Sequence, residues 1–468
     1  MNVKVGMISL GCPKNSVDSE IMLGLLEKEG FRLTTNKEEA RIIIINTCSF
    51  IESAKSESIE AILEITELKK KNSPLKSIIE TGCLPQRYQD KLKKEIPEID
   101  FMLGLNHVTD IVKICKKSIR RNSSIPPSPL LQRGVRGDLT NLQLFKNSSW
   151  NLKQKTGLYK SNLPRKLLTP KATAYVKITD GCDNWCSYCT IPSIRGSFRS
   201  RSIASIVDEA AILAENGVKE INLIGQDTTS YGRDFKKNIS FINLLKKLID
   251  VKGIEWIRIL YTYPSEINPE LISLIRSEKK ICKYLDVPLQ HIDNSILKNM
   301  RRRYTGRDIH CLIDKIRKSI PDISLRTSII TGFPGETDKQ FKKLCSFIKE
   351  IGFDNLGAFS YSREEGTKAY ALKNQIPEKV KIKRLKEIMR IQKNISFRKN
   401  KKLIGSCQKV LIEGYSQETD LLLAGRIQGQ APDVDGITYV NEGNPATGEI
   451  SDILITNAIG YDLVGKVI

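Results

Sequence analysis

The fold is decided by residues 172–189, ATAYVKITDGCDNWCSYC, in which an apolar strand leads directly into a loop with three cysteines. The thiols of Cys182, Cys186 and Cys189 are spaced four and three residues apart. A structural zinc site takes four ligands, and no fourth cysteine or histidine lies nearby in the sequence, so zinc is the weaker alternative. Thiolates also hold iron–sulfur clusters, and a four-iron cluster bound by three cysteines keeps one iron open to an outside ligand. The loop therefore predicts a reactive iron–sulfur site.

An alternation of strand and helix continues from this loop to about residue 400. Six strand candidates are each followed by a helical or loop segment, and such units predict an open, partial barrel of βα units. The candidates are Ala174–Ile178, Glu220–Ile224, Trp256–Leu260, Tyr284–Val287, Ser324–Ile330 and Asn355–Tyr361.

Residues 1–118 show the same alternation on a smaller scale. The strand candidates Val3–Leu10, Ala40–Asn46 and Ser77–Thr81 alternate with apolar residues at helical spacing in 16–29 and 54–70. This pattern predicts an open parallel sheet with crossover helices.

A cysteine follows each of these three strands, at Cys12, Cys48 and Cys83. The spacing alone favours three separate buried cysteines. However, the carboxyl ends of parallel strands open onto one crevice, so three successive loops can bring their sulfurs to one point. Gly11 and Gly82 precede two of these cysteines and allow the backbone to approach closely. We therefore expect a second cluster held by three thiolates.

Two further segments differ in composition. Residues 119–170 carry 10 Lys and Arg against 1 Asp, and include SSIPPSP at 123–129. They predict a basic linker or insertion, largely disordered, with a phosphate-binding arm as the alternative. Residues 401–468 contain five short alternating strands separated by Gly, Asn and Asp turns, which predicts a small closed β-barrel. These strands are Gln408–Ile412, Leu421–Arg426, Ile437–Val440, Ile453–Ala458 and Leu463–Val467.

The composition describes a globular chain of two or three domains, with 468 residues, 75 Lys and Arg and 53 Asp and Glu. It excludes collagen, wholesale disorder and a disulfide miniprotein. No apolar run approaches the roughly 18–20 residues of a membrane span, and the start lacks the apolar core of a secretion signal. Eleven cysteines, an odd number, suit a reducing compartment, so we expect a cytoplasmic protein without a membrane partner. Packing is the expected role of the remaining five, Cys115, Cys282, Cys311, Cys345 and Cys407.

With these residues in hand, the chain resembles the radical S-adenosylmethionine (SAM) methylthiotransferases over nearly its whole length. The spacing of the three cysteines in 182–189 resembles the superfamily's cluster motif. The stretch SLGCPKNSVDSE at 9–20 resembles the branch that modifies a ribosomal protein, because Gln usually follows this cysteine in the tRNA-modifying branch. The stretches IPSIRG at 191–196, GR at 425–426 and APDVDG at 431–436 point the same way.

The resemblance implies a domain order and cofactors. Residues 1–118 would be the methylthiotransferase amino-terminal domain, 119–170 an insertion longer than the family's usual connection, 171–400 the radical SAM domain and 401–468 a TRAM barrel. Cys182, Cys186 and Cys189 would hold the 4Fe-4S cluster that cleaves SAM, and an auxiliary 4Fe-4S cluster would carry the sulfur. One SAM would be the radical source and another the methyl donor. The auxiliary ligands would be Cys12, Cys48 and Cys83.

SAM contacts are expected at the carboxyl ends of the barrel strands, where such sites lie. The candidates are Gln226, Asp227, Gln290 and Glu336. Ordinary turn chemistry is the alternative explanation for each of them. No catalytic residue is predicted beyond the cluster ligands.

The resemblance and the charge pattern together predict a substrate. The last 68 residues carry 5 Lys and Arg against 9 Asp and Glu, which suits a basic protein partner better than a nucleic-acid backbone. The predicted reaction adds a methylthio group to the β-carbon of an aspartate of small-subunit ribosomal protein twelve, free or in the ribosome, with a separate electron donor. One alternative is a tRNA adenosine 2-methylthiotransferase with the same clusters, for which tRNA would be the partner. A second is a non-catalytic iron–sulfur protein that binds RNA or transfers electrons.

Overall fold

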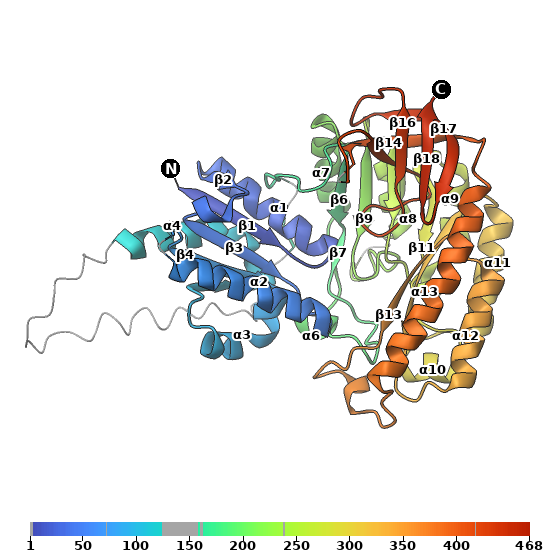
Figure 1. Ribbon diagram of the computed structural model, residues 1–468, viewed down its shortest axis with the longest axis horizontal. Helices are drawn as coiled ribbons and strands as arrows, with labels where there is room; N and C mark the ends of the chain where they lie inside the picture. The colour runs from blue at the N-terminus through green and yellow to red at the C-terminus, as the bar shows by residue number, and fades with distance from the viewer. Residues whose placement is uncertain (1–2, 72, 124–157, 160–161, 237–238, 417) are drawn as a thin grey trace, which may run out of the picture. The chain divides into compact units, whose positions relative to one another are not determined.

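The computed structural model describes residues 3–71, 73–123, 158–159, 162–236, 239–416 and 418–468. They form two compact units, and Figure 1 labels many of their helices and strands. Unit 1 comprises the chain up to Lys166 together with Ser193–Arg195, and unit 2 comprises Leu167–Pro192 and Gly196–Ile468. Most of the predicted linker, 124–157 and 160–161, lies outside the described residues, so its disorder stays a prediction. Among the described helices, none has the length and apolar character to cross a membrane.

Unit 1 is built on a parallel sheet in the order β2-β1-β3-β4-β5. The three predicted strands form its centre, and a three-residue strand that was not predicted from the sequence lies at each edge. The strands are β1 Lys4–Ser9, β2 Arg32–Thr34, β3 Ile42–Thr47, β4 Ser77–Gly82 and β5 Phe101–Leu103. The helices are α1 Pro13–Lys28, η1 Lys37–Glu39, α2 Glu52–Lys70, α3 Cys83–Glu95, η2 Leu105–Asp110 and α4 Ile111–Ser123.

The sheet of unit 1 is buried on both faces. Four consecutive isoleucines, Ile42–Ile45, begin β3, and all four are buried. Such a continuous apolar run is typical of a central strand covered by helices on both sides. Ile43 and Ile45 share one core with Ile62 and Ile65 of α2. The pairing of β3 with β1 and β4 is parallel throughout, so all three strands end at the same edge of the sheet.

A buried carboxyl group in β4 makes the stability of unit 1 depend on pH. Glu80 is 0% exposed, and burial raises its pKa to about 8. Because the pKa of Glu80 in the folded state lies above its ordinary value, the folded protein binds this proton more tightly than the unfolded chain does. The resulting contribution to stability is fully present below pH 4.5 and is lost as the pH rises toward 8. Glu80→Gln is therefore expected to stabilise unit 1 at pH 8 by on the order of 3 kcal/mol, with little effect at pH 4.5.

Hydrogen exchange of the β3 and β4 amides at several pH values checks this expectation. Glu60→Gln on the exposed surface of α2 is the matched control and should follow the wild type. Equal pH dependence in the wild type and in Glu80→Gln would contradict it.

Unit 2 begins with a parallel sheet in the order β13-β12-β11-β10-β9-β6, which confirms the partial barrel of six βα units. The strands are β6 Thr173–Lys177, β9 Glu220–Ile224, β10 Trp256–Ile259, β11 Ile281–Asp286, β12 Ser324–Thr331 and β13 Asn355–Ser360. A short ribbon, β7 Thr179–Asp180 with β8 Arg199–Ser200, flanks the first strand. The helices are α7 Ile203–Glu215, α8 Phe241–Ile249, η3 Pro264–Glu266, α9 Pro269–Ser277, α10 Asn294–Asn299, α11 Gly306–Ser319, α12 Asp338–Ile351, η4 Lys368–Ala371 and α13 Glu378–Lys401. The short helix α6 Ile191–Arg195 has its first two residues in unit 2 and the other three in unit 1.

The end of unit 2 is the predicted small closed barrel, with the strand order β14-β15-β16-β18-β17. Its core is aliphatic and includes Val410, Ile412, Val440 and Ile453. The strands are β14 Cys407–Tyr415, β15 Leu423–Ile427, β16 Thr438–Glu442, β17 Ile450–Ile459 and β18 Asp462–Val467.

The loop after β15 attaches this small barrel to the amino-terminal ends of the partial-barrel strands. The carbonyl oxygen of Gly429 accepts hydrogen bonds from Ser324 Oγ (3.1 Å) and Asn355 Nδ2 (3.0 Å). Both donors are the first residues of their strands, β12 and β13. Arg426 likewise reaches Glu220, the first residue of β9. The attachment therefore leaves the carboxyl-terminal ends of the strands for other contacts.

Candidate active site

The cysteines of unit 1 lie where neighbouring strands end. Cys12 precedes α1 and follows β1 by three residues, Cys48 directly follows β3, and Cys83 directly follows β4 and begins α3. Because β1, β3 and β4 are adjacent and parallel, all three loops leave the same edge of the sheet.

Two glycines make this approach possible. Gly11 has φ +95°, and a Cβ there would lie 2.7 Å from the Cβ and 3.1 Å from the Sγ of Cys48. Gly82 has φ +100°, and a Cβ there would lie 2.4 Å from the carbonyl oxygen of Thr47. Asn15 fixes the loops, since its Nδ2 donates to the carbonyl oxygen of Thr47 (2.9 Å) and its Oδ1 lies 3.9 Å from Cys83 Sγ. Side chains larger than hydrogen at either glycine would separate the loops.

The three thiols of this set influence one another electrostatically. Burial, opposed by the charge of Arg195 in the same unit, raises the pKa of Cys83 to about 12, and Cys48 and Cys12 add to the rise. Burial also raises the pKa of Cys48, with Cys12 contributing. For Cys12, burial acts upward, but the charges of Lys14 and Arg195 outweigh it and lower the pKa. Three thiols that act on one another electrostatically suit a group that binds thiolates and carries compensating positive charge.

The second set lies on the loop after β6 and β7 in unit 2. Gly181 has φ +78°, and a Cβ there would lie 2.1 Å from the carbonyl oxygen of Ser197. Cys189 N donates to the carbonyl oxygen of Cys186 (3.1 Å), which curls the loop. Ser187 anchors it at the end of α10, because its Oγ donates to the carbonyl oxygen of Asn299 (2.7 Å). The three cysteines are therefore held on one tightly tethered turn.

Burial governs the thiols of this loop as well. It raises the pKa of Cys182 to about 11 and that of Cys189 above its ordinary range, and Cys186 contributes to both. Among the described residues, no three His, Cys, Asp or Glu side chains are arranged to hold a single metal ion. A cluster binds each thiolate to a different iron and so accepts wider spacing, and both cysteine sets fit such a group by their donor chemistry.

Arg302 is a neighbour of this loop that was not predicted from the sequence. Its Nη1 lies 3.5 Å from Cys186 Sγ, and its Nη2 donates to the carbonyl oxygen of Pro288 (2.6 Å). The guanidinium stacks on the rings of Tyr263 (4.4 Å) and Tyr304 (5.0 Å). The only sequence signal was the basic run 301–303, which is also typical of a solvated surface.

The four predicted SAM-contact residues occupy different surroundings. Gln226 Nε2 donates to Asp180 Oδ1 (3.2 Å), whereas its Oε1 is buried without a hydrogen-bond partner in the described structure. Gln290, four residues after the end of β11, adopts φ +72°. Glu336 is fully buried, where its carboxylate lies 3.3 Å from His291 Nε2 and 2.8 Å from Arg384 Nη1.

Asp227 holds the cysteine loop through Asn184. Its carboxylate accepts four hydrogen bonds, from Asn184 Nδ2 (2.9 Å), Thr229 Oγ1 (2.9 Å), and the backbone N (3.1 Å) and Oγ (2.8 Å) of Ser230. Asn184 lies between the first two cysteines of the loop. The buried carboxylate therefore connects the end of β9 to the predicted cluster ligands.

Asp227→Asn is expected to loosen this loop. The side-chain nitrogen of asparagine cannot accept the hydrogen bonds that a carboxylate oxygen of Asp227 accepts from its neighbours. We expect a loss of about 1–3 kcal/mol in local stability and a lower iron content after anaerobic reconstitution. Iron analysis and loop hydrogen exchange measure the two effects, with Asp314→Asn on the exposed surface of α11 as the control. Full iron content with lost SAM binding would contradict this and favour the direct SAM contact that the sequence predicts.

Family models match three parts of the chain. The uncharacterized protein family UPF0004 matches residues 4–104, the radical SAM superfamily residues 176–348 and the TRAM domain residues 404–468. Among solved structures, the chain is similar to the radical SAM methyltransferase TsrM from Kitasatospora setae, with a TM-score of 0.52 and 15% identity over 87% of this chain and 77% of that one. At this identity the likeness shows the fold alone. Fold and family models together define a radical SAM enzyme with a carboxy-terminal TRAM domain.

Curated relatives extend over the whole chain. It is 48% identical to the ribosomal protein uS12 methylthiotransferase RimO of Geotalea uraniireducens, over 99% of this chain and 98% of the relative. It is 45% identical to the RimO of Acetivibrio thermocellus, over 100% and 99%. The chain belongs to the RimO family of radical SAM methylthiotransferases. The resemblance described from the sequence is thereby confirmed.

Proposed function

We propose that this protein adds a methylthio group to the β-carbon of an aspartate in ribosomal protein uS12. The proposal rests chiefly on one observation: two sets of three cysteines lie at the carboxyl ends of parallel strands in a chain whose full-length relatives are uS12 methylthiotransferases. We propose uS12, free or in the small ribosomal subunit, as the substrate and the cytoplasm as the location of the enzyme.

The six cysteines are the proposed cluster ligands. Cys12, Cys48 and Cys83 would hold an auxiliary 4Fe-4S cluster, and Cys182, Cys186 and Cys189 the radical SAM cluster. When bound, these groups and SAM supply the radical chemistry, the methyl group and the sulfur. The chain's own task is to bind, orient and exclude water.

Unpartnered polar atoms in the partial barrel support SAM binding there. Gln226 Oε1, Thr179 Oγ1 and both amide atoms of Asn222 are buried without hydrogen-bond partners in the described structure. Buried polar groups normally have partners, so each of these atoms is suited to contact a polar ligand. We propose that Gln226 accepts a hydrogen bond from the amino group of SAM and that Gln290 lines the same site. Asp227 and Glu336, whose carboxylates already bind neighbouring side chains, would fix the positions of the residues that surround this site.

The domain boundaries proposed above, 1–118, 119–170, 171–400 and 401–468, are supported by the three family matches, each of which falls inside one segment. The long basic insertion matches none of these models.

Mass spectrometry of a deletion strain tests the proposed substrate. We expect the methylthio mark on uS12 to disappear and the methylthioadenosine of digested tRNA to remain, and a plasmid copy of the gene should restore the mark. Loss of the tRNA modification with an intact uS12 mark would favour the tRNA enzyme. Failure of the reduced protein to cleave SAM despite two intact clusters would favour the non-catalytic alternative.

A further inference from the structure

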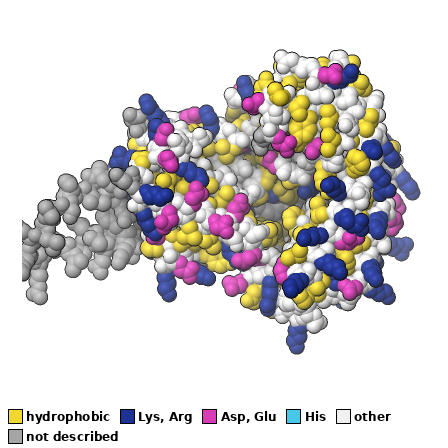
Figure 2. Space-filling model, viewed as in Figure 1, with side chains coloured by type: hydrophobic (Ala, Val, Ile, Leu, Met, Phe, Trp, Pro, Cys, Tyr) yellow, Lys and Arg dark blue, Asp and Glu magenta, His cyan; other side chains and the backbone are white. Residues whose placement is uncertain are grey.

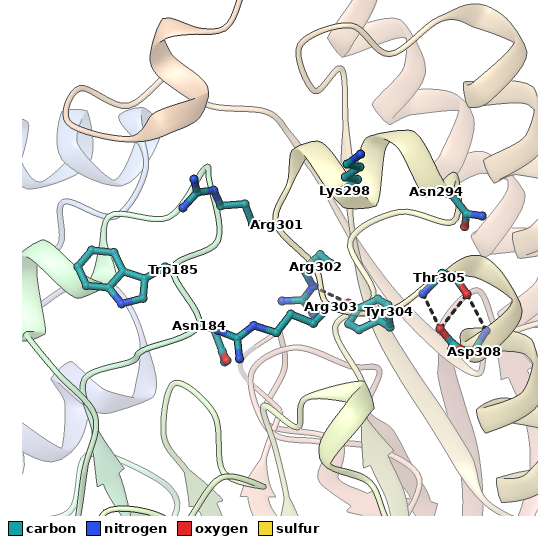
Figure 3. Close-up of a pocket in the computed structure, with 10 residues that line it drawn as sticks. All are labelled: Asn184, Trp185, Asn294, Lys298, Arg301, Arg302, Arg303, Tyr304, Thr305 and Asp308. Carbon is teal, nitrogen blue, oxygen red and sulfur yellow. Dashed lines mark hydrogen bonds between the residues drawn. The ribbon is translucent and has the colours of Figure 1, made fainter.

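An open pocket of about 640 Å³ lies beside the second cysteine loop, entirely within unit 2. Figure 3 shows Asn184 and Trp185 of the loop on one side, with Arg301, Arg302 and Arg303 extending from the segment after α10. Its remaining lining residues are Asn294, Lys298, Tyr304, Thr305 and Asp308. We name the exposed part, Trp185 with Lys298, Arg301 and Arg303, the basic face.

The aromatic member of the basic face is an indole turned outward. Trp185 is 59% exposed, lies between Cys182 and Cys186, and has φ +52°. This backbone conformation is uncommon for a bulky residue and has an energetic cost. Exposed tryptophan together with arginine is the combination enriched at the centres of protein–protein contacts. The loop that carries the predicted cluster ligands thus also presents a contact residue.

The charges of the basic face are available to a partner. Lys298, Arg301 and Arg303 are exposed and form no ion pair within the described residues. The one carboxylate in the pocket lining, Asp308, accepts hydrogen bonds from Thr305 N and Oγ1 (2.8 Å each) in a helix cap. Positive charge alone is not distinctive, since Figure 2 shows Lys and Arg side chains scattered widely over the visible surface of unit 2. The distinctive feature is positive charge around the outward indole of the cysteine loop.

Arg302 connects this face to the site behind it. Its guanidinium is part of the pocket lining and lies 3.5 Å from Cys186 Sγ. A protein docked on the basic face would therefore contact the cysteine loop itself and a pocket whose lining includes this neighbour of Cys186. Proteins that exchange electrons use small, weak contacts steered by opposite charges, and this face has that character.

We propose that the basic face is the docking surface for an acidic one-electron carrier protein. The proposal rests on the proposed function, because the radical SAM reaction needs an electron at the cluster of Cys182, Cys186 and Cys189. In the docked pair, the reduced carrier loses one electron and the oxidised cluster gains it, and no bond is made or broken in this step. The face suits a basic ribosomal protein poorly, since like charges in contact repel. An RNA backbone is the competing occupant, and the test includes it.

The test compares two ways of reducing the reconstituted holoenzyme. The probe is a reduced, acidic plant-type [2Fe–2S] ferredoxin, and dithionite is the small reductant that needs no docking surface. The variant is Arg301→Glu with Arg303→Glu, and the control is Lys339→Glu with Lys386→Glu, which changes the charge equally on the exposed surfaces of α12 and α13. We expect the variant to raise the KM for ferredoxin in SAM cleavage about tenfold and to flatten its dependence on salt. SAM cleavage with dithionite, and both assays of the control, should match the wild type.

The outcomes separate the docking surface from the proposed function. An unchanged ferredoxin KM in the variant would overturn the docking proposal. An unchanged KM together with weaker binding of small-subunit ribosomal RNA would assign the face to RNA instead. Absence of dithionite-driven SAM cleavage in the wild type would count against the proposed function. If only the variant fails to cleave SAM with dithionite, Arg301 and Arg303 take part in the reaction itself, and the docking proposal is overturned. The neutral pair Arg301→Gln with Arg303→Gln should give an intermediate KM if charge is the cause.

Discussion

Replacing Cys182, Cys186 and Cys189 together by alanine is expected to abolish SAM cleavage and to leave about half of the wild-type iron, since one of two four-iron clusters would remain. The physical reason is that the two sets belong to different units, each with its own strands and its own tethering hydrogen bonds. Removing one set should therefore not dismantle the other. Iron and sulfide analysis of protein purified without air, together with electron paramagnetic resonance, measures the outcome.

Two further triple variants serve as controls for this experiment. Cys12→Ala, Cys48→Ala and Cys83→Ala should also leave about half of the iron, but SAM cleavage should persist while methylthiolation stops. Cys311→Ala, Cys345→Ala and Cys407→Ala remove three thiols from positions outside both sets and should keep all of the iron. Complete iron loss in either site variant would indicate a single shared cluster. Zinc in place of iron would contradict the proposed chemistry altogether.

The central strands and the positions of the six cysteines were predictable because both signals are local. An apolar strand pattern followed by a cysteine places a thiol at the carboxyl end of a strand, whatever the rest of the fold is. The edge strands β2 and β5 were missed because three residues are too few to show a period of two. Arg302 was missed for a different reason, since only the folded chain brings it to Cys186, 116 residues away.

The charge of the tail shows how a correct prediction can rest on a weak argument. The net negative charge of 401–468 suggested a basic partner, but six of its nine acidic side chains already bind groups of unit 2. Glu413 pairs with Arg426 (2.6 Å), and Asp435 accepts from Tyr284 Oη (2.7 Å). The composition alone cannot distinguish these paired charges from free surface charges, because pairing between residues far apart in the sequence produces no local sequence pattern. The family membership, not this charge, now supports the ribosomal substrate.

Between the partial barrel and the small barrel lies a buried charge network whose disruption should be costly. Glu220 is 0% exposed, Arg258 Nε donates to its Oε1 (2.8 Å), and Arg426 Nη2 contacts its Oε2. Burial acts to raise the pKa of Glu220, but the charges of Arg426 and Arg258 outweigh it and lower the pKa to about 2. Because this folded pKa is depressed, the stabilisation is fully present above the ordinary value of 4.5 and is lost as the pH falls toward 2. The network therefore acts at full strength at neutral pH.

Glu220→Gln is expected to destabilise unit 2 by about 3–5 kcal/mol at pH 7, because it leaves two buried guanidinium groups without their shared carboxylate. Hydrogen exchange of the β9, β10 and β14–β18 amides measures the loss, and Glu255→Gln, an exposed carboxyl just before β10, is the control. Since Glu220 joins the two barrels, both sets of amides should lose protection together. A loss confined to β14–β18 would mean that the partial barrel does not depend on the network. Unchanged protection throughout would mean that a neutral amide serves both arginines as well as the carboxylate does.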